Sequence, residues 1–374
     1  MDIVKIDTSN KRDVRHFLNF PFELYHHTPQ WVPPFESDAR RMLDRRRHPF
    51  YQHSDADFFL ALKTDRIVGR LGVLENRHYN EFNHTRTALF YLYEAEDDFE
   101  ISRGLFNAAF DWATARGLTE VYGPKGFTAL DGMGLLVKGF EHRPALGIPY
   151  NPVYYLQHLE ALGFVKIHDV VSGYLDARNL VFPDKVHQVA ALVQKRRGLR
   201  IARYQTRRDL RSLIAPLKQL YNDSLGGTVD NMPLTDNEVK MMADQLLMFA
   251  DPRLIKVVMK DETPVGFSFA YPDVSAAVQR TKGRLWPFGW IDLLIELKRT
   301  KWVNLNGAGI IEKYRGNGGT ALLWSEMYKS IVEGGFHQAD IVQIGADNDT
   351  MQREIAGFGM DFYKVHRMYK KTIE

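Results

Sequence analysis

The glycine-rich segment 315–320, with the sequence Arg-Gly-Asn-Gly-Gly-Thr, has the residue types best suited to a chemical role. It follows an apolar run at 302–311 and precedes residues 321–332, whose apolar members recur at the spacing of one helix face. A helix that begins among these glycines presents free backbone amides and the positive end of its dipole, a combination that binds phosphate. Arg315 at the rim can add a charge-assisted hydrogen bond. The segment therefore predicts a phosphate-binding site.

Two common phosphate motifs fit this segment poorly. A Walker P-loop requires a lysine after its last glycine, and Thr320 stands there. A dinucleotide fingerprint is partly met by Gly316, Gly318 and Ala321. However, Asp340 precedes the next apolar run instead of ending it, so its carboxylate would not reach a ribose. A glycine-rich helix start that binds nothing is the remaining alternative.

With Tyr314 and the apolar strand before it, the segment resembles the acyl-CoA pyrophosphate motif of the GCN5-related N-acetyltransferases (GNAT), Gln/Arg-x-x-Gly-x-Gly/Ala. One position departs from the motif, since Thr320 adds a side chain where the family has glycine or alanine. The resemblance implies that the chain uses acetyl-CoA or a longer acyl-CoA as donor. It also implies that the amides of residues 317–320 bind the pyrophosphate.

The same resemblance implies the other donor contacts. The strand before the glycines would separate from its neighbour, so that its backbone groups bind pantetheine and polarise the thioester carbonyl. A backbone donor aimed at the developing oxyanion contributes on the order of 3 kcal/mol. Asn348 would contact pantetheine, or cap a helix, or do both. The implied cofactor-binding residues are Gly309, Ile310, Ile311, Arg315, Gly316, Asn317, Gly318, Gly319, Thr320 and Asn348.

Composition limits the class of protein. The 374 residues suggest two domains, and 45% hydrophobic with 25% charged residues is ordinary for a soluble globular protein. A net charge of +3 is too small to indicate nucleic-acid binding. The absence of cysteine excludes disulfides, thiolate catalysis and cysteine-ligated zinc, and no histidine spacing indicates another metal. Because no apolar run reaches membrane-spanning length, we expect a cytoplasmic protein.

An internal repeat organises the chain. Four anchors return in order at an offset of 196 or 197 residues, which is hard to obtain by chance. The pairs are Arg12–Arg15 with Arg208–Arg211, Tyr25 with Tyr221, Ile67–Gly69 with Pro264–Gly266, and Leu162–Phe164 with Phe358–Met360. We therefore predict two homologous halves, 1–177 and 200–374, joined by a linker helix within 178–199 that starts at Pro183.

Each half shows the same order of expected elements. Strands are expected at 2–7, 58–63, 67–74 and 87–93, and again at 200–206, 254–260, 264–271 and 302–311. Strands mixed with helices in this rhythm indicate a mixed α/β sheet. The order also resembles the GNAT fold twice over, so the expected fold class is α/β with two tandem GNAT-like domains.

The two halves differ where the cofactor would bind. In the first half the strand at 87–93 is followed by the acidic segment 94–100 and by a helix expected at 101–116. Acidic residues suit a helix N-terminus, but they would repel a pyrophosphate. We therefore expect the first half to have lost its cofactor site, which leaves one CoA per chain.

Two long segments invite a functional interpretation. The glycine- and proline-rich segment 123–155 is expected to form part of an acceptor pocket, or else an ordered cover over the sheet. The second half also carries an insertion at 272–300, with the strongly apolar stretch 285–297. That stretch could be a lid helix packed on its own domain, a dimer contact, an acyl channel, or a contact with a membrane surface.

The catalytic groups are harder to place. The family usually has a tyrosine acid four residues before a closing glycine, and here that residue, four before Gly359, is Ile355. Tyr154 and Tyr155 are our candidates to replace it, with Tyr314, Tyr328 and Tyr363 as alternatives. A base near neutral pKa is also needed if the amine arrives protonated, and His142 is the candidate, with His337 as an alternative.

The sequence thus favours an acyl-CoA-dependent N-acyltransferase acting on the amine of a small-molecule or lipid acceptor. A non-catalytic CoA-binding module and an aminoacyl-tRNA-dependent transferase of the paired-GNAT type are the alternatives. We interpret the basic cluster at 195–211 as a solvated face, and no nucleic-acid partner is expected. Peripheral membrane contact through 285–297 and a monomeric or homodimeric state remain open.

Overall fold

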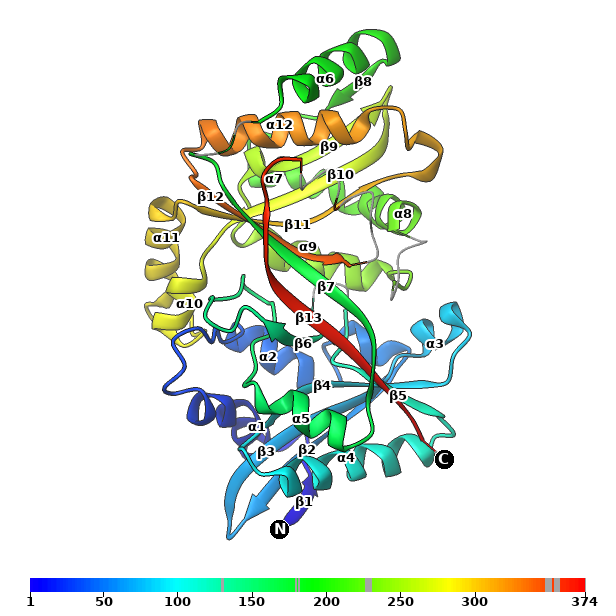
Figure 1. Ribbon diagram of the computed structural model, residues 1–374, viewed down its shortest axis with the longest axis vertical. Coiled ribbons are helices and arrows are strands. Elements are labelled where there is room, and N and C mark those ends of the chain that lie inside the picture. Colours follow the sequence, from blue (N-terminus) through cyan, green and yellow to red (C-terminus); the bar gives the residue numbers. More distant parts are fainter. Residues whose placement is uncertain are drawn as a thin grey trace.

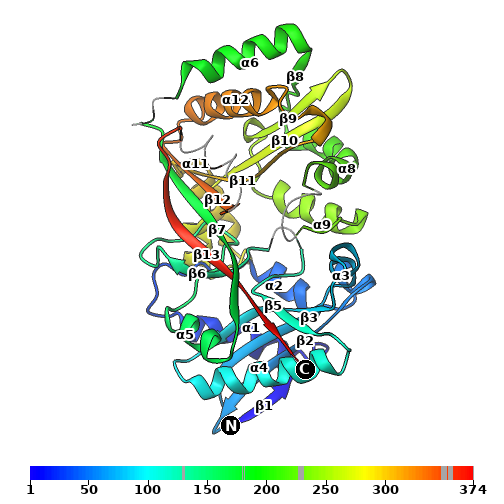
Figure 2. The ribbon, with the colours of Figure 1, turned by 45° about the vertical axis from the view of Figure 1, so that its right-hand side comes forward.

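The structure is a computed structural model that describes residues 1–128, 131–178, 180, 182–225, 231–346, 352 and 357–373. Within these residues the strands form one mixed sheet of thirteen strands, which runs through both halves of the chain (Figure 1). The molecule is elongated along the direction in which the two halves follow one another (Figures 1 and 2).

The first half contains seven strands and five α-helices among the described residues. In chain order these are β1 (Asp2–Lys5), α1 (Lys11–Leu24), α2 (Glu36–Leu43), β2 (Asp55–Lys63), β3 (Arg66–Glu75), α3 (Arg77–Asn83), β4 (Thr87–Ala95), α4 (Phe99–Thr114), β5 (Glu120–Gly123), β6 (Leu135–Lys138), α5 (Tyr154–Ala161) and β7 (Val165–Asp176).

The rest of the chain follows a similar order. Its elements are α6 (Asp184–Arg197), β8 (Leu199–Ile201), α7 (Arg207–Leu210), α8 (Ile214–Leu225), α9 (Asp236–Leu247), β9 (Ile255–Lys260), β10 (Thr263–Pro272), α10 (Ser275–Thr281), α11 (Gly289–Arg299), β11 (Trp302–Ile310), α12 (Gly319–Glu333), β12 (Gln338–Gly345) and β13 (Asp361–Thr372). Short 3-10 helices lie at Pro49–Gln52, Arg211–Leu213, Pro252–Leu254 and Glu312–Tyr314.

The repeat seen in the sequence reappears in the lengths of the strands. β3 and β10 are both ten residues long, β4 and β11 are both nine, and β7 and β13 are both twelve. The offset rises to 215 residues between β4 and β11, because two helices, α10 and α11, lie between β10 and β11, whereas α3 alone lies between β3 and β4. The expected strands therefore form, with ends that differ by a few residues from the predicted ones.

The hairpin between β2 and β3 shows how local sequence sets these elements. Lys63 pairs with Arg66, so Thr64 and Asp65 form a two-residue turn, and both have positive φ values of 50° and 62°. Positive φ at both central residues is the geometry that matches the twist of paired strands. The apolar runs on either side of the turn form β2 and β3.

The two halves exchange their last strands, which the sequence did not predict. β7 of the first half pairs with β12 of the second, and β13 of the second half pairs with β5 of the first. β7 and β13 also pair with each other, antiparallel, along their length. Figures 1 and 2 show these two strands crossing the middle of the molecule. Because each half completes the other's sheet, the hydrogen bonds of the sheet hold the halves together.

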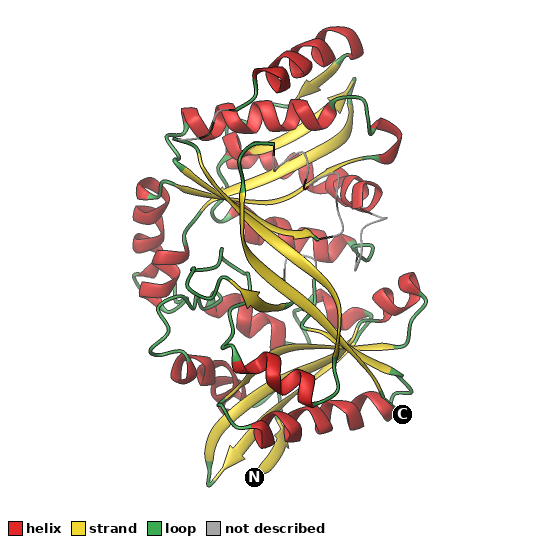
Figure 3. Ribbon diagram, in the orientation of Figure 1, coloured by secondary structure: helices red, strands yellow, loops and turns green. Residues whose placement is uncertain are grey.

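Helices cover the sheet and enclose the cores (Figure 3). In the first half, α4 packs on β2 and β3. In the second half, α12 buries Leu323, Trp324 and Met327, whose spacing is that of one helix face. The helix expected between the halves is α6, which begins after Pro183 and ends at Gly198 with a left-handed φ of 63°. It packs against α12.

Candidate functional site

The helix predicted at the glycine segment is α12, which begins at Gly319 with Gly318 as its N-cap. Gly316 and Gly318 have φ values of 72° and 81°, in the region that favours glycine. No acceptor for the backbone amides of Gly318, Gly319 and Thr320 is found among the described residues. These amides and the helix dipole give the segment the properties of an anion site.

Arginines surround this helix start in an arrangement that differs from the expected one. Arg315 turns away from the amides, because its Nε and Nη2 donate to the carbonyl oxygens of Ile310 and Ser224 at 3.2 and 3.0 Å. Arg197, from the end of α6, donates instead to the side-chain oxygen of Asn317 at 2.7 Å. The guanidinium at the helix start therefore comes from the helix between the halves. The sequence signal for it was the basic run at 195–197.

The strand before the glycines separates from its parallel neighbour. β11 pairs with β12 over Trp302–Leu305 only, although β11 continues to Ile310. Gly307 lies in the unpaired part, with a φ of 100° that makes a bulge against β10. This is the separation that the family resemblance implied, in the half in which it was expected.

The structure distinguishes among the three backbone positions expected on this strand. The amide of Ile311 donates to Val265 at 2.9 Å, and the carbonyl of Ile310 accepts from Arg315. Gly309 lies against the side chain of Ser224 on α8, whose buried hydroxyl has no hydrogen-bond partner among the described residues. Asn348, the other expected pantetheine contact, lies outside the described residues.

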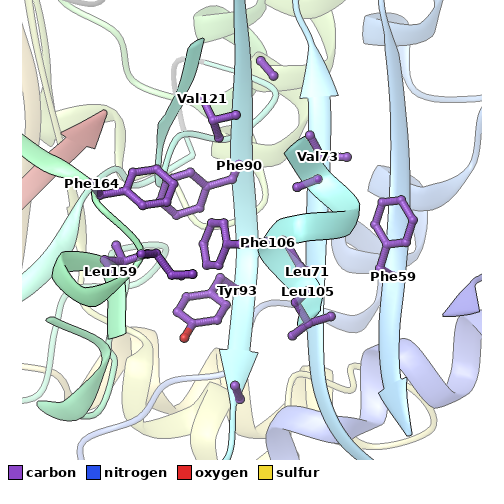
Figure 4. Packing of buried hydrophobic residues seen from close by; sticks show 14 of the residues in the cluster. Phe59, Leu71, Val73, Phe90, Tyr93, Leu105, Phe106, Val121, Leu159 and Phe164 are labelled. Atoms are coloured by element: carbon purple, nitrogen blue, oxygen red, sulfur yellow. The ribbon is translucent and has the colours of Figure 1, made fainter. Parts of the chain in front are cut away.

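In the first half the corresponding separation is filled by side chains. β4 pairs with β5 over Thr87–Leu89 only, although its pairing with β3 continues to Ala95. Beyond that point Phe90, Tyr93, Phe106 and Phe164 pack together, with ring centroids 5.0–5.5 Å apart in four pairs, Phe90 with Phe106, Phe90 with Phe164, Tyr93 with Phe106 and Phe106 with Phe164 (Figure 4). The sequence suggested that the acidic segment 94–100 would exclude a pyrophosphate, but it did not predict this aromatic packing.

Tyr154 and Tyr155, our candidate acids, bond to the end of the same strand. The hydroxyl of Tyr154 donates to the carbonyl of Ala95 at 2.7 Å, and that of Tyr155 accepts from the Ala95 amide at 2.6 Å. Burial raises the pKa of both hydroxyls. Because α5 and α12 lie toward opposite ends of the molecule, these tyrosines are not brought to the glycine segment (Figures 1 and 2). Their catalytic role stays a prediction.

A cavity of about 290 Å³ lies between the two halves. Its wall combines α1, α2, Arg70 of β3, the second part of β4, the segment after β5, α9 with the residues after it, and the loop that follows α10. The apolar lining residues include Leu18, Pro21, Phe22, Trp31, Val32, Phe35, Met42, Leu135, Leu146, Ile148, Met241, Leu246 and Phe249. The glycine- and proline-rich segment expected to form an acceptor pocket supplies Pro124, Thr128, Asp131, Leu135 and residues 146–151.

Charged residues also line the cavity, several of them on α2 and others at positions 70, 94, 131, 282 and 284. Arg70 and Glu94 form an ion pair with 2.6 Å between Nε and Oε2, and both side chains are mostly buried. Burial raises the pKa of Asp131, which accepts hydrogen bonds from the amide and hydroxyl of Thr128. Burial also lowers the pKa of His48 to about 4, which keeps its ring neutral near pH 7. None of these groups was predicted from the sequence, although a charged Arg70 inside an apolar strand was a signal.

The cavity reaches the second half's sheet at Tyr271 and Asn306. Asn306 is the first residue of β11 after its pairing with β12 ends at Leu305. The wall of the cavity therefore includes the point at which the two parallel strands separate. The cavity between the halves is therefore lined in part by β11, the strand that leads to the glycine segment.

A buried polar cluster attaches the 123–155 segment to the second half. Lys364 Nζ donates to Asp340 Oδ2 and to the Arg143 carbonyl, at 3.1 Å each. The Tyr363 hydroxyl donates to the same carboxylate oxygen at 2.8 Å. His142, our candidate base, lies beside this cluster with its ring 4.8 Å from that of Tyr363, and it is half exposed and paired with Glu141. Its role as a base stays a prediction.

His366 provides a pH-dependent contribution to this attachment. Its Nε2 donates to the carbonyl oxygen of Pro149 at 3.0 Å, and burial lowers its pKa to about 4 from the ordinary 6.5. Below pH 6.5 the unfolded chain binds a proton that the folded chain does not, so stability falls as the pH falls toward 4. The variant His366→Gln can still donate to Pro149. We expect its free energy of unfolding to fall by about 2–3 kcal/mol less than that of the wild type between pH 7 and pH 4.5. Urea unfolding at the two pH values measures this, and equal losses would contradict it.

Two known proteins resemble the chain in sequence over nearly its whole length. No family model matches the chain. Protein YghO of Escherichia coli (strain K12) is 27% identical over 372 residues, covering 97% of this chain and 94% of that protein. A bacterial ceramide synthase of Caulobacter vibrioides is 27% identical over 387 residues, covering 100% of this chain and 98% of that protein.

Solved structures with the same arrangement span the whole chain. A tandem GNAT protein from the clavulanic acid biosynthesis pathway matches with a TM-score of 0.57 and 13% identity, over 99% of this chain and 98% of that one. A GCN5-related N-acetyltransferase from Sphaerobacter thermophilus matches with a TM-score of 0.51 and 12% identity, over 100% and 96%. The chain therefore has the GNAT fold, present twice in tandem, as the sequence predicted.

Proposed function

We propose that the protein is an acyl-CoA-dependent N-acyltransferase, with the donor bound in the second half and the amine acceptor in the cavity between the halves. The observation that carries the proposal is the contact of this cavity with Asn306, where β11 and β12 separate. A thioester held along β11 and an amine in the cavity would meet at that point.

The donor site is proposed from the start of α12. The amides of Gly318, Gly319 and Thr320 would bind the pyrophosphate, and Arg197 would add a positive charge beside them. We propose no donor site in the first half, since in its described part aromatic side chains fill the strand separation and Tyr154 and Tyr155 bond to the backbone of Ala95. One donor per chain is therefore the proposed stoichiometry.

The acceptor is proposed to be an amine that carries a long alkyl chain. The lining of the cavity is largely apolar, which suits an alkyl chain better than a sugar or a peptide. One relative that covers the whole chain is called a bacterial ceramide synthase, and a ceramide is a long-chain amino alcohol acylated on its nitrogen. The carboxylates of Glu94 and Asp131 would attract the ammonium group of such an acceptor.

The proposed reaction forms one amide bond and breaks one thioester bond. The amine first loses a proton, and its nitrogen then attacks the thioester carbonyl, whose oxygen becomes an oxyanion. Backbone amides in the unpaired part of β11 would stabilise that oxyanion. The carbon–sulfur bond then breaks, and CoA leaves as a thiolate that takes up a proton.

Release of free CoA thiol tests this proposal. The purified protein would be mixed with acyl-CoAs of increasing length and with amines of increasing length. Thiol release that requires both substrates, and that grows with the length of the amine, is the expected result. A non-catalytic module would bind CoA without releasing it, and a protein that binds no CoA in calorimetry would overturn the donor site as well. Stabilisation by aminoacyl-tRNA instead of CoA would favour the remaining alternative.

Leu246 on α9 offers a test of the acceptor cavity. A tryptophan at this lining position would occupy space that the alkyl chain needs. Binding of the amine would weaken by about 1–3 kcal/mol. We expect Leu246→Trp to raise the KM for a long-chain amine about tenfold or more and to leave CoA affinity unchanged. Leu247→Trp is the matched control, because this neighbour on the same helix does not line the cavity. Equal effects of the two substitutions on KM would argue against the cavity as the acceptor site.

A further inference from the structure

The insertion in the second half leaves an apolar surface uncovered. The side chains that form it, which we call the α11 patch, are Trp286, Phe288, Trp290, Ile291, Leu294 and Ile295. Trp286 and Phe288 are 82% and 72% exposed, which is unusual for aromatic residues. The other face of α11 packs inward through Leu293 and Leu297. α11 is therefore an amphipathic helix whose outer face is apolar.

Among the described residues, the charges around the α11 patch that lack an ion-pair partner are positive. The acidic residues of α11, Asp292 and Glu296, are both paired with Arg280 of α10, at 2.8 and 2.5 Å. The cations Lys282, Lys298, Arg299 and Lys301 are exposed, and none of them has an ion-pair partner among the described residues. Ile291, Leu294, Ile295, Lys298 and Arg299 follow one another on one face of α11, so the patch is bordered by positive charge.

The α11 patch adjoins the opening of the cavity. Lys282 and Arg284, which line the cavity, lie only a few residues before Trp286. Arg284 pairs with Glu36 of α2 at 3.3 Å, and Gln279 donates to the carbonyl oxygens of Pro29 and Trp31 at 2.8 Å. The loop that carries the exposed aromatics thus packs on the segment at 29–36 that forms one wall of the cavity. Figure 1 shows α10 and α11 at one edge of the molecule, next to α2.

We propose that the α11 patch docks the protein on the surface of a bilayer that contains anionic phospholipids. Aromatic and aliphatic side chains with flanking lysine and arginine are the composition of helices that lie in a membrane interface. A second copy of the chain fits less well, because a symmetric contact would bring the same unpaired cations together. Among the described residues no helix is long and apolar enough to cross a bilayer.

Docking in this way would place the cavity opening at the lipid surface. A long-chain amine dissolved in the bilayer could then pass into the cavity without crossing water, which is unfavourable for an alkyl chain. This consequence rests on the proposed function, whereas binding to the bilayer does not. The experiment therefore measures binding to vesicles that contain neither an amine substrate nor acyl-CoA.

Co-sedimentation with vesicles tests the proposal. One set of vesicles is phosphatidylcholine alone, and the other contains phosphatidylglycerol as well. We expect the wild type to bind the second set more tightly, and binding to weaken as salt is added. Trp286→Ala/Phe288→Ala should lower the partition coefficient about tenfold or more. Lys298→Glu/Arg299→Glu should remove the preference for phosphatidylglycerol.

Phe82→Ala is the matched control, since Phe82 is an exposed aromatic on α3, away from α11 (Figure 1). It should bind vesicles as the wild type does. Melting temperatures check that each variant is folded, and CoA affinity should be the same in all of them. A wild type that does not bind phosphatidylglycerol vesicles, or an aromatic variant that binds equally well, would overturn the proposal. So would a wild-type dimer that the same variant converts to a monomer, because the patch would then be a dimer contact.

Discussion

Replacing Thr320 by glutamate is expected to lower the affinity for CoA about 30-fold, a loss of about 2 kcal/mol, without lowering the stability of the protein. Thr320 is the second residue of α12, and its amide has no acceptor among the described residues. A carboxylate at this position would lie where we propose that the pyrophosphate binds, and the two anions would repel each other. The same carboxylate interacts favourably with the helix dipole, so stability should stay equal or rise by up to about 1 kcal/mol.

A variant that binds CoA less tightly but is as stable as the wild type has lost the ligand site and not the fold. Calorimetry with CoA and thermal unfolding of the free protein measure the two quantities. Val332→Glu is the matched control, because it adds the same charge to an exposed position at the far end of α12. Gly318 is a poorer choice for substitution, since a Cβ there would lie 2.4 Å from Val193 of α6 and would disturb packing as well as binding. Unchanged affinity in Thr320→Glu would place the donor elsewhere.

The sequence predicted those parts of the molecule that depend on residues close together in the chain. The hairpin at Thr64 and Asp65, the start of α12 at its glycines and the helix between Pro183 and Gly198 all follow from local turn and capping residues. The duplication was also visible, because the repeated segments keep their spacing. The tandem GNAT fold could therefore be predicted from the amino-acid sequence alone.

The features that the sequence did not predict depend on contacts between the halves. The apolar pattern of β7 and β13 is the same whichever strand lies beside them, so it does not reveal their exchange. The position of Arg197 at the start of α12 requires α6 to pack on α12, which no local pattern specifies. The cavity likewise depends on both halves, because residues 146–151 of the first half and residues of α9 in the second line it together.

The buried pair of Lys364 and Asp340 leads to the second large expected effect. Lys364→Met is expected to lower the free energy of unfolding by about 3–5 kcal/mol near pH 7. The ammonium group is fully buried and donates to Asp340 and to the Arg143 carbonyl. Without it, the Asp340 carboxylate would keep the Tyr363 hydroxyl but would lose the opposite charge.

The loss in Lys364→Met should depend on pH in a defined direction. Burial already raises the pKa of Asp340, and removing Lys364 removes the charge that lowers it most. A carboxyl whose folded-state pKa lies above its unfolded value destabilises the fold as the pH rises through the folded value. The variant should therefore recover stability relative to the wild type as the pH is lowered toward 4. Adding Asp340→Asn to the variant should restore most of the stability at pH 7.

We expect Lys364→Met to affect the proposed acceptor site as well as stability. Arg143 precedes the residues at 146–151 that line the cavity, so releasing its carbonyl should loosen that wall. We expect the folded variant to bind a long-chain amine less tightly while its affinity for CoA stays the same. Lys370→Met is the control on the same strand, because its pair with Glu120 is partly exposed and should change stability by less than about 1 kcal/mol. If Lys364→Met cost no more than Lys370→Met, the buried pair would not be what holds the 123–155 segment on the second half. A cavity wall that stayed in place without the pair would then depend on the remaining contacts, which include Arg143 with Asp273, His366 with Pro149 and the pairing of β6 with β13.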